Sequence, residues 1–399
     1  MIQEKRPPFF LIYVHESQYP RYFLLYLQSK ITLSQSGGIN KIFMITTKNL
    51  SYLRDLSYKT AEEFLHDISY GGKLYNIFDD NFIFRGHSSD EYTLRPLVQR
   101  TIPYFEKYGY KEEISDNLFF FAHTEFSQAY NEYLYLNEFF KICDENQLYV
   151  PEVRRMRETM PWNLQGGEFM LDIYGKDKVW LPEGLYELAT LAQHHGVPTR
   201  LLDWTQDLNV AIYFAVSGTI PRLTTPPRYT EGEAIKKRIN DISRHFKKTI
   251  VNEEKKENKL EIWAMDKRVE LAHIGKNPLR IIHPRYHDNG NLGAQKGILT
   301  FWEIKKPLKI DKDKGIVPEI AWRDEKSLDE HITEFLLEKG EPSKPYLYQI
   351  TLSETAILEL YKFIKRNRCD AAALFPGYDG VVRCMKEDNM FNKINKNKK

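Results

Sequence analysis

Residues 84–90 read FRGHSSD and place an arginine at the end of an apolar, strand-like stretch. Gly86 follows Arg85, so the backbone can turn there and the guanidinium is free to face a cleft. A guanidinium is a planar fork of N–H donors that suits phosphate oxygens. Arg85 is therefore a candidate anion-binding residue. The structural alternative is a pair between Arg85 and a buried carboxylate.

Residues 188–205 read LATLAQHHGVPTRLLDWT and form the second stretch that is dense in chemically able groups. His194 and His195 are adjacent, and an imidazole can carry a proton near neutral pH. The stretch leads into a helix over residues 209–215, in which small alanine side chains permit the close approach of another element. The structural alternative is a tight turn fixed by polar side chains, with Trp204 as a core anchor.

The sequence patterns of several common sites are absent. There is no GxxxxGK[ST], no GxGxxG after a strand and no GxSxG, so neither a P-loop nor a nucleophile elbow is predicted. His15 and Glu16 lack a second histidine, because Tyr19 occupies its position. His123 begins an H-x-E tripeptide that no PCxxC follows. No metal ligand is predicted from these patterns.

Two weaker patterns would fit a nuclease. Asp288 lies upstream of an E-x-K tripeptide formed by Glu303 and Lys305, and such a set can bind Mg²⁺ and activate water. Arg268 and His273 have a spacing that would place both near one helix face, where they could cleave RNA by acid–base chemistry. Both patterns arise easily by chance in a chain rich in charged residues.

Regular elements must position these groups, and the apolar spacing predicts them along much of the chain. The expected helices cover residues 60–68, 111–147, 184–193, 208–216, 327–340 and 353–365, and the expected strands cover 81–86, 260–265, 297–304 and 346–352. The apolar runs at 21–28 and 39–46 could each be a strand, but periodicity does not separate helix from strand in runs this short. Strands mixed with helices in this order predict an α+β fold, with a mixed or antiparallel sheet and a helical insertion.

The domain organisation follows from the same reading. Residues 1–55 are expected to be an N-terminal lead-in, and residues 56–386 an α+β domain with a helical segment at about 105–190. Residues 222–259 are charged and rich in Pro and Thr, which is typical of a solvated insertion. Residues 387–399 are expected to be a disordered basic tail.

Charge and composition narrow the class of protein. The chain has 399 residues, and its 57 Lys and Arg against 55 Asp and Glu give a net charge of +2, which argues against a surface that is basic throughout. The three cysteines form no CxxC pair, which favours a reducing compartment over a disulfide framework. No apolar stretch near the start is long enough for a membrane span or laid out as a signal peptide. A cytoplasmic location without a membrane partner is expected.

Several motifs together resemble the FRG-domain family, named for its Phe/Tyr-Arg-Gly start. They are FRG at 84–86, LRP at 94–96 and LAQHHGVPTRLLDWTQDLNVAIYFA at 191–215. Two later pieces also fit, GAQKG at 293–297 and LFPGYDG at 374–380. The resemblance runs from about residue 60 to residue 386, with residues 222–259 as an insertion.

The order of these motifs is in turn similar to ADP-ribosyltransferases, which use NAD as a substrate. That similarity implies an ADP-ribosyltransferase-like core with a cation for the pyrophosphate, a hydroxyl beside it and rings that stack on nicotinamide. The implied NAD-binding residues are Arg85, His194, Thr199, Arg200, Trp204 and Tyr213. The implied catalytic residues are Arg85, His195, Asp203, Thr205 and Gln295.

The catalytic acid stays open at the level of sequence. The similarity implies a Glu on a late strand, but Gln295 stands just before that strand and cannot ionise. Glu303 and Asp379 are substitutes, and Asp203 is either a further candidate or a structural partner of Arg200.

The leading hypothesis is an NAD-dependent ADP-ribosyltransferase that acts as a toxin or anti-phage effector on a nucleic-acid or protein acceptor. The alternatives are a non-catalytic ligand-binding module and a ribonuclease-type toxin. The sequence leaves open whether an antitoxin or chaperone partner exists.

Overall fold

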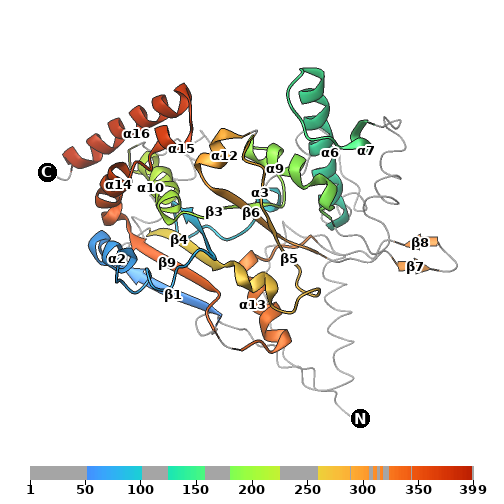
Figure 1. Ribbon diagram of the computed structural model, residues 1–399, viewed down its shortest axis with the longest axis horizontal. Coiled ribbons are helices and arrows are strands. Elements are labelled where there is room, and N and C mark those ends of the chain that lie inside the picture. Colours follow the sequence, from blue (N-terminus) through green and yellow to red (C-terminus); the bar gives the residue numbers. More distant parts are fainter. Residues whose placement is uncertain are drawn as a thin grey trace, which may run out of the picture.

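The computed structural model describes residues 52–100, 125–157, 180–224, 259–287, 289–304, 309–311, 315–317, 323–342 and 344–397 (Figure 1). Its centre is a seven-stranded sheet in the order β1-β9-β4-β2-β3-β6-β5. β1 and β9 pair parallel, and the other neighbours pair antiparallel. The predicted α+β class with a mixed sheet is confirmed.

The strands of the sheet are β1 Leu53–Tyr58, β2 Phe82–His87, β3 Leu202–Thr205, β4 Lys259–Asp266, β5 Leu279–Ile282, β6 Gly297–Trp302 and β9 Leu347–Ser353. A separate hairpin consists of β7 Lys309–Asp311 and β8 Gly315–Val317. The α-helices are α2 Ala61–Ile68, α3 Leu97–Arg100, α6 Glu125–Glu145, α7 Arg154–Arg157, α9 Tyr186–His194, α10 Leu208–Thr224, α12 Gly290–Ala294, α13 Leu328–Lys339, α14 Ile357–Arg366, α15 Ala371–Leu374 and α16 Tyr378–Asn397. The 3₁₀-helices are η4 Glu183–Leu185, η5 Lys267–Leu271 and η6 Glu354–Ala356.

Local signals explain where several helices begin and end. The Thr60 hydroxyl accepts a hydrogen bond from the Glu63 N–H at 3.2 Å and caps α2. Ser327 and Glu330 form a capping box at the start of α13, and Gly340 ends that helix in the left-handed region at φ 66°. These elements were predicted because their signals are local in sequence.

Alternation along β2 divides the core into two layers. Phe82 and Phe84 pack in the cluster that contains α10, α14 and α16, whereas Ile83 packs in the cluster that contains α13. A third cluster lies between α6 and α9. Figure 1 shows α10, α14 and α16 grouped apart from α13, and α6 standing beside the far end of the sheet.

Gly86 lets α10 lie directly on β2. A Cβ atom at Gly86 would be 1.9 Å from the Ala211 carbonyl oxygen and 2.7 Å from the Ala215 nitrogen. The close approach predicted for Ala211 and Ala215 is therefore present, and β2 is the element that approaches. Arg85, one residue earlier, points to the opposite face of β2 from this helix.

Two boundaries differ from the sequence-based prediction. The predicted disordered tail at 387–399 is wrong, because α16 continues to Asn397 and buries Glu387 and Ile394 against the core. Met390 and Phe391 pack on the same cluster, so enough apolar area is covered to order the helix. The sheet also begins inside the expected lead-in, since β1 starts at Leu53 and pairs with β9.

Some predictions lie outside the described residues. These are the candidate strands at 21–28 and 39–46, the first part of the helix at 111–147, and nearly all of the insertion at 222–259. Among the helices that are described, none is long and apolar enough to span a bilayer.

Candidate functional site

The sheet opens between β2 and β3, and this opening forms the cleft. β2 pairs with β4 along its whole length but with β3 only at Phe84 and Thr205. β3 instead pairs along its whole length with β6. Beyond Phe84 the two central strands therefore separate. The Arg85 Nη1 donates a hydrogen bond across the opening to the Asp203 carbonyl oxygen at 2.6 Å.

The cleft has a volume of about 460 Å³, which is within the range of about 300–1,000 Å³ that is usual for small-molecule sites. Its lining combines cations, a carboxylate, amides and rings. The polar lining residues are Arg85, His87, Ser88, Arg100, Gln193, His194, Asp203, Thr205 and Gln295. The aromatic lining residues are Phe84, Tyr92, Trp204, Phe214 and Phe375.

A buried chain of hydrogen bonds fixes the Arg85 guanidinium. The Arg85 Nε donates to the His87 Nε2 at 2.9 Å, and the His87 Nδ1 lies 2.8 Å from Glu261 Oε2. Because Nε of an arginine is always a donor, His87 Nε2 accepts and Nδ1 carries the proton that His87 donates to Glu261. His87 is thus a neutral imidazole in this arrangement.

Glu261 anchors that chain in the core. Its side chain is fully buried, and it also accepts hydrogen bonds from Trp263 Nε1 at 2.7 Å and Gln349 Nε2 at 2.6 Å. Burial lowers the pKa of His87, although the bond to Glu261 acts in the opposite direction. Burial also lowers the pKa of Arg85, and the nearby Asp203 partly offsets this. The guanidinium keeps its charge, because arginine pKa values lie far above neutral pH.

A second hydrogen-bonded set positions Asp203 at the edge of the cleft. Gln193 Nε2 donates to the two carboxylate oxygens of Asp203 at 3.2 and 3.1 Å, and Thr199 donates to Gln193 Oε1. The Asp203 carboxylate lies 3.9 Å from Arg85 Nη1 and its side chain is 64% exposed. Asp203 is therefore accessible to a ligand, whereas Thr199 is buried and acts on the cleft only through Gln193.

Thr205 and Gln295 hold the opposite wall together. The Thr205 hydroxyl donates to the Gln295 carbonyl oxygen at 2.7 Å and accepts from the Asp207 N–H at 3.0 Å. Gln295 Nε2 donates to the Leu374 carbonyl oxygen at 3.1 Å. Both residues line the cleft, as their predicted roles require, but these contacts occupy the Thr205 hydroxyl and the Gln295 Nε2.

The substitutes for the catalytic acid do not line the cleft. Glu303 follows the far end of β6 and forms an ion pair of 2.6 Å with Arg280. Asp379 lies exposed in the first turn of α16. Of the carboxylates named from the sequence, Asp203 alone lines this cleft.

Arg200 and Tyr213 were predicted to bind NAD, but the structure buries both of them away from the cleft. Arg200 pairs with Glu132 at 2.7 Å and with Glu125 at 3.0 Å. These ion pairs join α6 to the segment just before β3. The partner of Arg200 is thus α6 and not Asp203. The Tyr213 hydroxyl donates to Glu387 at 2.9 Å.

Of the two predicted histidines and Trp204, only His194 is available to a ligand in the cleft. His194 lines the cleft, and burial together with the neighbouring His195 lowers its pKa. His195 is exposed, does not line the cleft and stacks on Phe139 with ring centroids 6.4 Å apart. Trp204 borders the cleft but is 3% exposed, and its Nε1 donates to Thr300 at 2.8 Å. The indole is thus a core anchor, as the structural alternative stated.

The nuclease patterns are not assembled where the chain is described. Arg268 pairs with Asp266 at 2.7 Å, and His273 pairs with Glu341 at 3.0 Å. η5 ends at Leu271, so the expected common helix face does not exist. Asp288 lies outside the described residues. The described part of the chain contains no group of three or more His, Cys, Asp or Glu residues that could hold a metal ion.

Several cleft residues were not predicted from the sequence. His87 had a usable signal, because it is two residues from Arg85 on a strand and so shares its face. Gln193 lies inside the predicted motif but was assigned no role. Arg100 and Tyr92 had no signal, since only the fold of residues 88–100 brings them to the cleft.

These features define an α+β protein with a cleft between two separated strands and an arginine fixed in that cleft. The family model of the FRG domain matches residues 80–223, so the chain contains an FRG domain. The match covers β2, α9, β3 and α10, which carry Arg85, His194 and Asp203. Comparison with curated proteins and with solved structures found no significant match.

Proposed function

We propose that this protein is an NAD-dependent ADP-ribosyltransferase that acts as a toxin or anti-phage effector on a nucleic-acid or protein acceptor. The observation that carries the proposal is the opening between β2 and β3, where the fixed Arg85 and the accessible Asp203 lie 3.9 Å apart. An open sheet with the Arg85 guanidinium on one strand and the Asp203 carboxylate on the other can hold a polar, extended ligand.

The cleft residues suit the parts of NAD. Two arginines, Arg85 and Arg100, supply positive charge for the pyrophosphate. Arg85 uses two of its five N–H groups on His87 and Asp203, so others are left for a phosphate. Tyr92 and Phe375 supply aromatic faces for a planar ring. The positive cleft and its rings are thus complementary to a dinucleotide.

The proposed reaction breaks the bond between ribose C1′ and the nicotinamide nitrogen. Nicotinamide leaves neutral with the bonding electron pair, because its ring nitrogen is positively charged in NAD. The ribose passes through an oxocarbenium-like state, which the Asp203 carboxylate stabilises by its negative charge. The acceptor forms the new bond to C1′ and releases its proton, for which His194, which lines the cleft, is the candidate base.

The test is transfer from labelled NAD to cell lysate, with nicotinamide release measured in parallel. We expect labelling by the full chain, and at least about a hundredfold loss in Arg85→Lys, because a lysine cannot reproduce the fork that joins His87 and Asp203. Arg366→Ala is the matched control, since Arg366 is exposed at the end of α14. Full labelling by Arg85→Lys would remove Arg85 from the mechanism.

A second candidate function is a non-catalytic site for a phosphorylated ligand. It is favoured by the contacts of Asp203, whose carboxylate oxygens both accept from Gln193, as in a satisfied structural network. This function predicts that ADP-ribose binds in calorimetry, that Arg85→Lys weakens this binding, and that NAD stays intact during long incubation.

A further inference from the structure

Two adjoining cavities lie at the Trp302 end of β6, whereas the cleft lies at its Gly297 end. The inner cavity has a volume of about 30 Å³ and the outer about 560 Å³. We call them together the second pocket. The residues that line both cavities are Trp302, Ile304, Asp324, Lys326 and His331.

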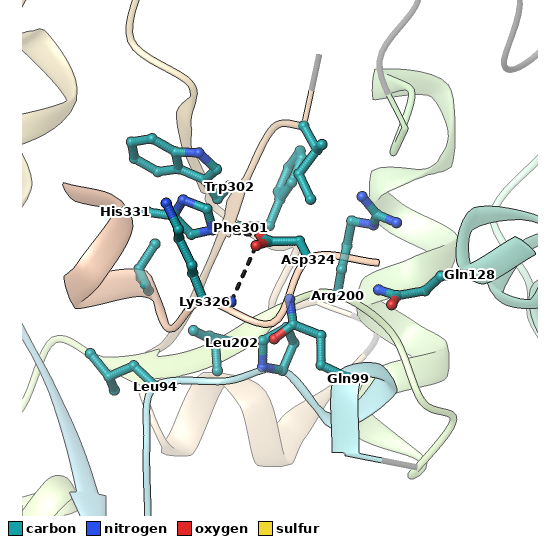
Figure 2. Close-up of a pocket in the computed structure, with 13 residues that line it drawn as sticks. Leu94, Gln99, Gln128, Arg200, Leu202, Phe301, Trp302, Asp324, Lys326 and His331 are labelled. Carbon is teal, nitrogen blue, oxygen red and sulfur yellow. Dashed lines mark hydrogen bonds and ion pairs between the residues drawn. The ribbon is translucent and has the colours of Figure 1, made fainter. Parts of the chain in front are cut away.

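Two glutamine side chains line the inner cavity, and the amide oxygen of each has no protein partner. Gln128 on α6 is only 5% exposed, and its Oε1 accepts no hydrogen bond. Gln99 on α3 likewise has a buried Oε1 that accepts none. Figure 2 shows Gln99 reaching the cavity from below and Gln128 from the right, beside Arg200. An unpaired buried amide oxygen costs free energy, so two in one cavity point to a ligand that donates hydrogen bonds to them.

An aromatic platform and two guanidiniums border the outer cavity. Trp302 is half-buried and stacks on His331 with centroids 5.0 Å apart, and Asp324 holds that imidazole at 2.5 Å. The Arg95 Nε is buried and has no partner. Arg323 donates to the Gln99 carbonyl oxygen at 3.2 Å. Neither arginine has a carboxylate partner among the described residues, so both are suited to an anion.

Four carboxylates also line the outer cavity, Glu303, Asp324, Glu325 and Glu330, and three of them are held by other groups, as His331 holds Asp324. Glu303 pairs with Arg280 at 2.6 Å, and Glu330 accepts from the Ser327 N–H at 2.7 Å in the capping box of α13. The outer cavity therefore offers a phosphate two guanidiniums, while the inner cavity offers a ring edge two amides.

We propose that the second pocket binds a nucleotide. A carboxamide presents a donor beside an acceptor, which matches the edge of a nucleobase. A half-buried indole provides a surface on which a base can stack. Arg95 and Arg323 are the groups for the phosphate. The same chemistry is shared by a free mononucleotide and by one unit of a single-stranded nucleic acid.

The second pocket and the cleft are joined by two short elements. In α3, Gln99 lines the second pocket and Arg100 lines the cleft. In β3, Leu202 lines the second pocket and Asp203 lines the cleft. A nucleotide in the second pocket would therefore lie next to the cleft. The inference does not depend on ADP-ribose transfer, since binding alone is measured.

The test uses the full chain, with mononucleotides measured by calorimetry and short fluorescein-labelled single-stranded RNA and DNA by anisotropy. Gln128→Leu keeps the volume and removes both hydrogen-bonding groups, so we expect affinity to fall about tenfold or more. Its Tm should stay level or rise, because an unpaired buried amide is removed. Arg95→Ala should lower the salt slope of binding by about one, whereas the exposed control Lys362→Ala should not.

Each outcome decides the inference. Tight binding of mononucleotides identifies a free nucleotide as the ligand, and binding of strands alone identifies a nucleic acid. Binding that survives Arg85→Ala but is lost in Gln128→Leu assigns it to the second pocket and not to the cleft. Absence of binding by every probe would overturn the proposal. Unchanged affinity in Gln128→Leu together with a lower Tm would also overturn it, because Gln128 would then be structural.

Discussion

Removing the Glu261 carboxylate should loosen the cleft from within the core. Glu261→Ala leaves three N–H donors without their acceptor, on His87, Trp263 and Gln349. A hydrogen bond to a charged group contributes about 1.5–3 kcal/mol, and the desolvation of the carboxylate offsets part of the sum. We therefore expect Glu261→Ala to lower the free energy of unfolding by about 3 kcal/mol.

Glu261→Gln is the matched control for this effect. Its carbonyl oxygen can still accept from His87 and Trp263, and the Gln349 amide can turn to accept from the new N–H₂ group. We expect a loss below about 1 kcal/mol, measured by urea unfolding of all three proteins. Equal losses in the two variants would refute the reasoning, because they would assign the stability to the charge and not to the hydrogen bonds.

Three further predictions concern the same core. Burial lowers the pKa of His87 in the folded state, so its contribution to stability is complete above the ordinary value of 6.5 and is lost as pH falls below it. His87→Gln should therefore flatten the pH dependence of urea unfolding below pH 6.5, relative to the parent protein. An unchanged slope would contradict a neutral His87. Gly86→Ala should cost more than about 2 kcal/mol, because its Cβ would meet the Ala211 carbonyl oxygen at 1.9 Å, whereas Gly184→Ala meets nothing within 4 Å and should be nearly neutral in thermal unfolding. Ile394→Ala should cost about 2–4 kcal/mol and the exposed Lys396→Ala almost nothing, and equal Tm values would mean that the end of α16 does not contribute.

The sequence predicted elements whose signals are local. The helix predicted at 327–340 and the strand predicted at 81–86 each depend on a few neighbouring residues, such as the capping box at Ser327 and the stop at Gly340, and each element is present. The end of α16 was missed because lysine and asparagine dominate its composition, while its order depends on burial of Ile394 against distant helices. Charge density alone does not report such tertiary contacts.

For the site, the sequence located the two motifs but not the contacts within them. Arg85, His194, Asp203, Thr205 and Gln295 do line one cleft. Arg200 and Tyr213 were misplaced because their buried carboxylate partners, Glu132 and Glu387, lie far away in sequence. A segment rich in chemically able residues can be recognised from the sequence. Which of its cations are left for a ligand depends on pairing with carboxylates that are remote in sequence.

The Phe-Arg-Gly triplet can be explained residue by residue from this geometry. Phe84 is the last point at which β2 pairs with β3, so it fixes where the strands separate. Gly86 lets the α10 backbone pack directly on one face of β2. This contact fixes the position of β2 where β3 separates from it. Arg85 projects from the opposite face and spans the opening to the Asp203 carbonyl oxygen. The triplet therefore builds the opening and places a cation in it, whichever chemistry the cleft performs, and changes at Phe84 or Gly86 should act through the shape of the cleft, whereas a change at Arg85 also removes its cation.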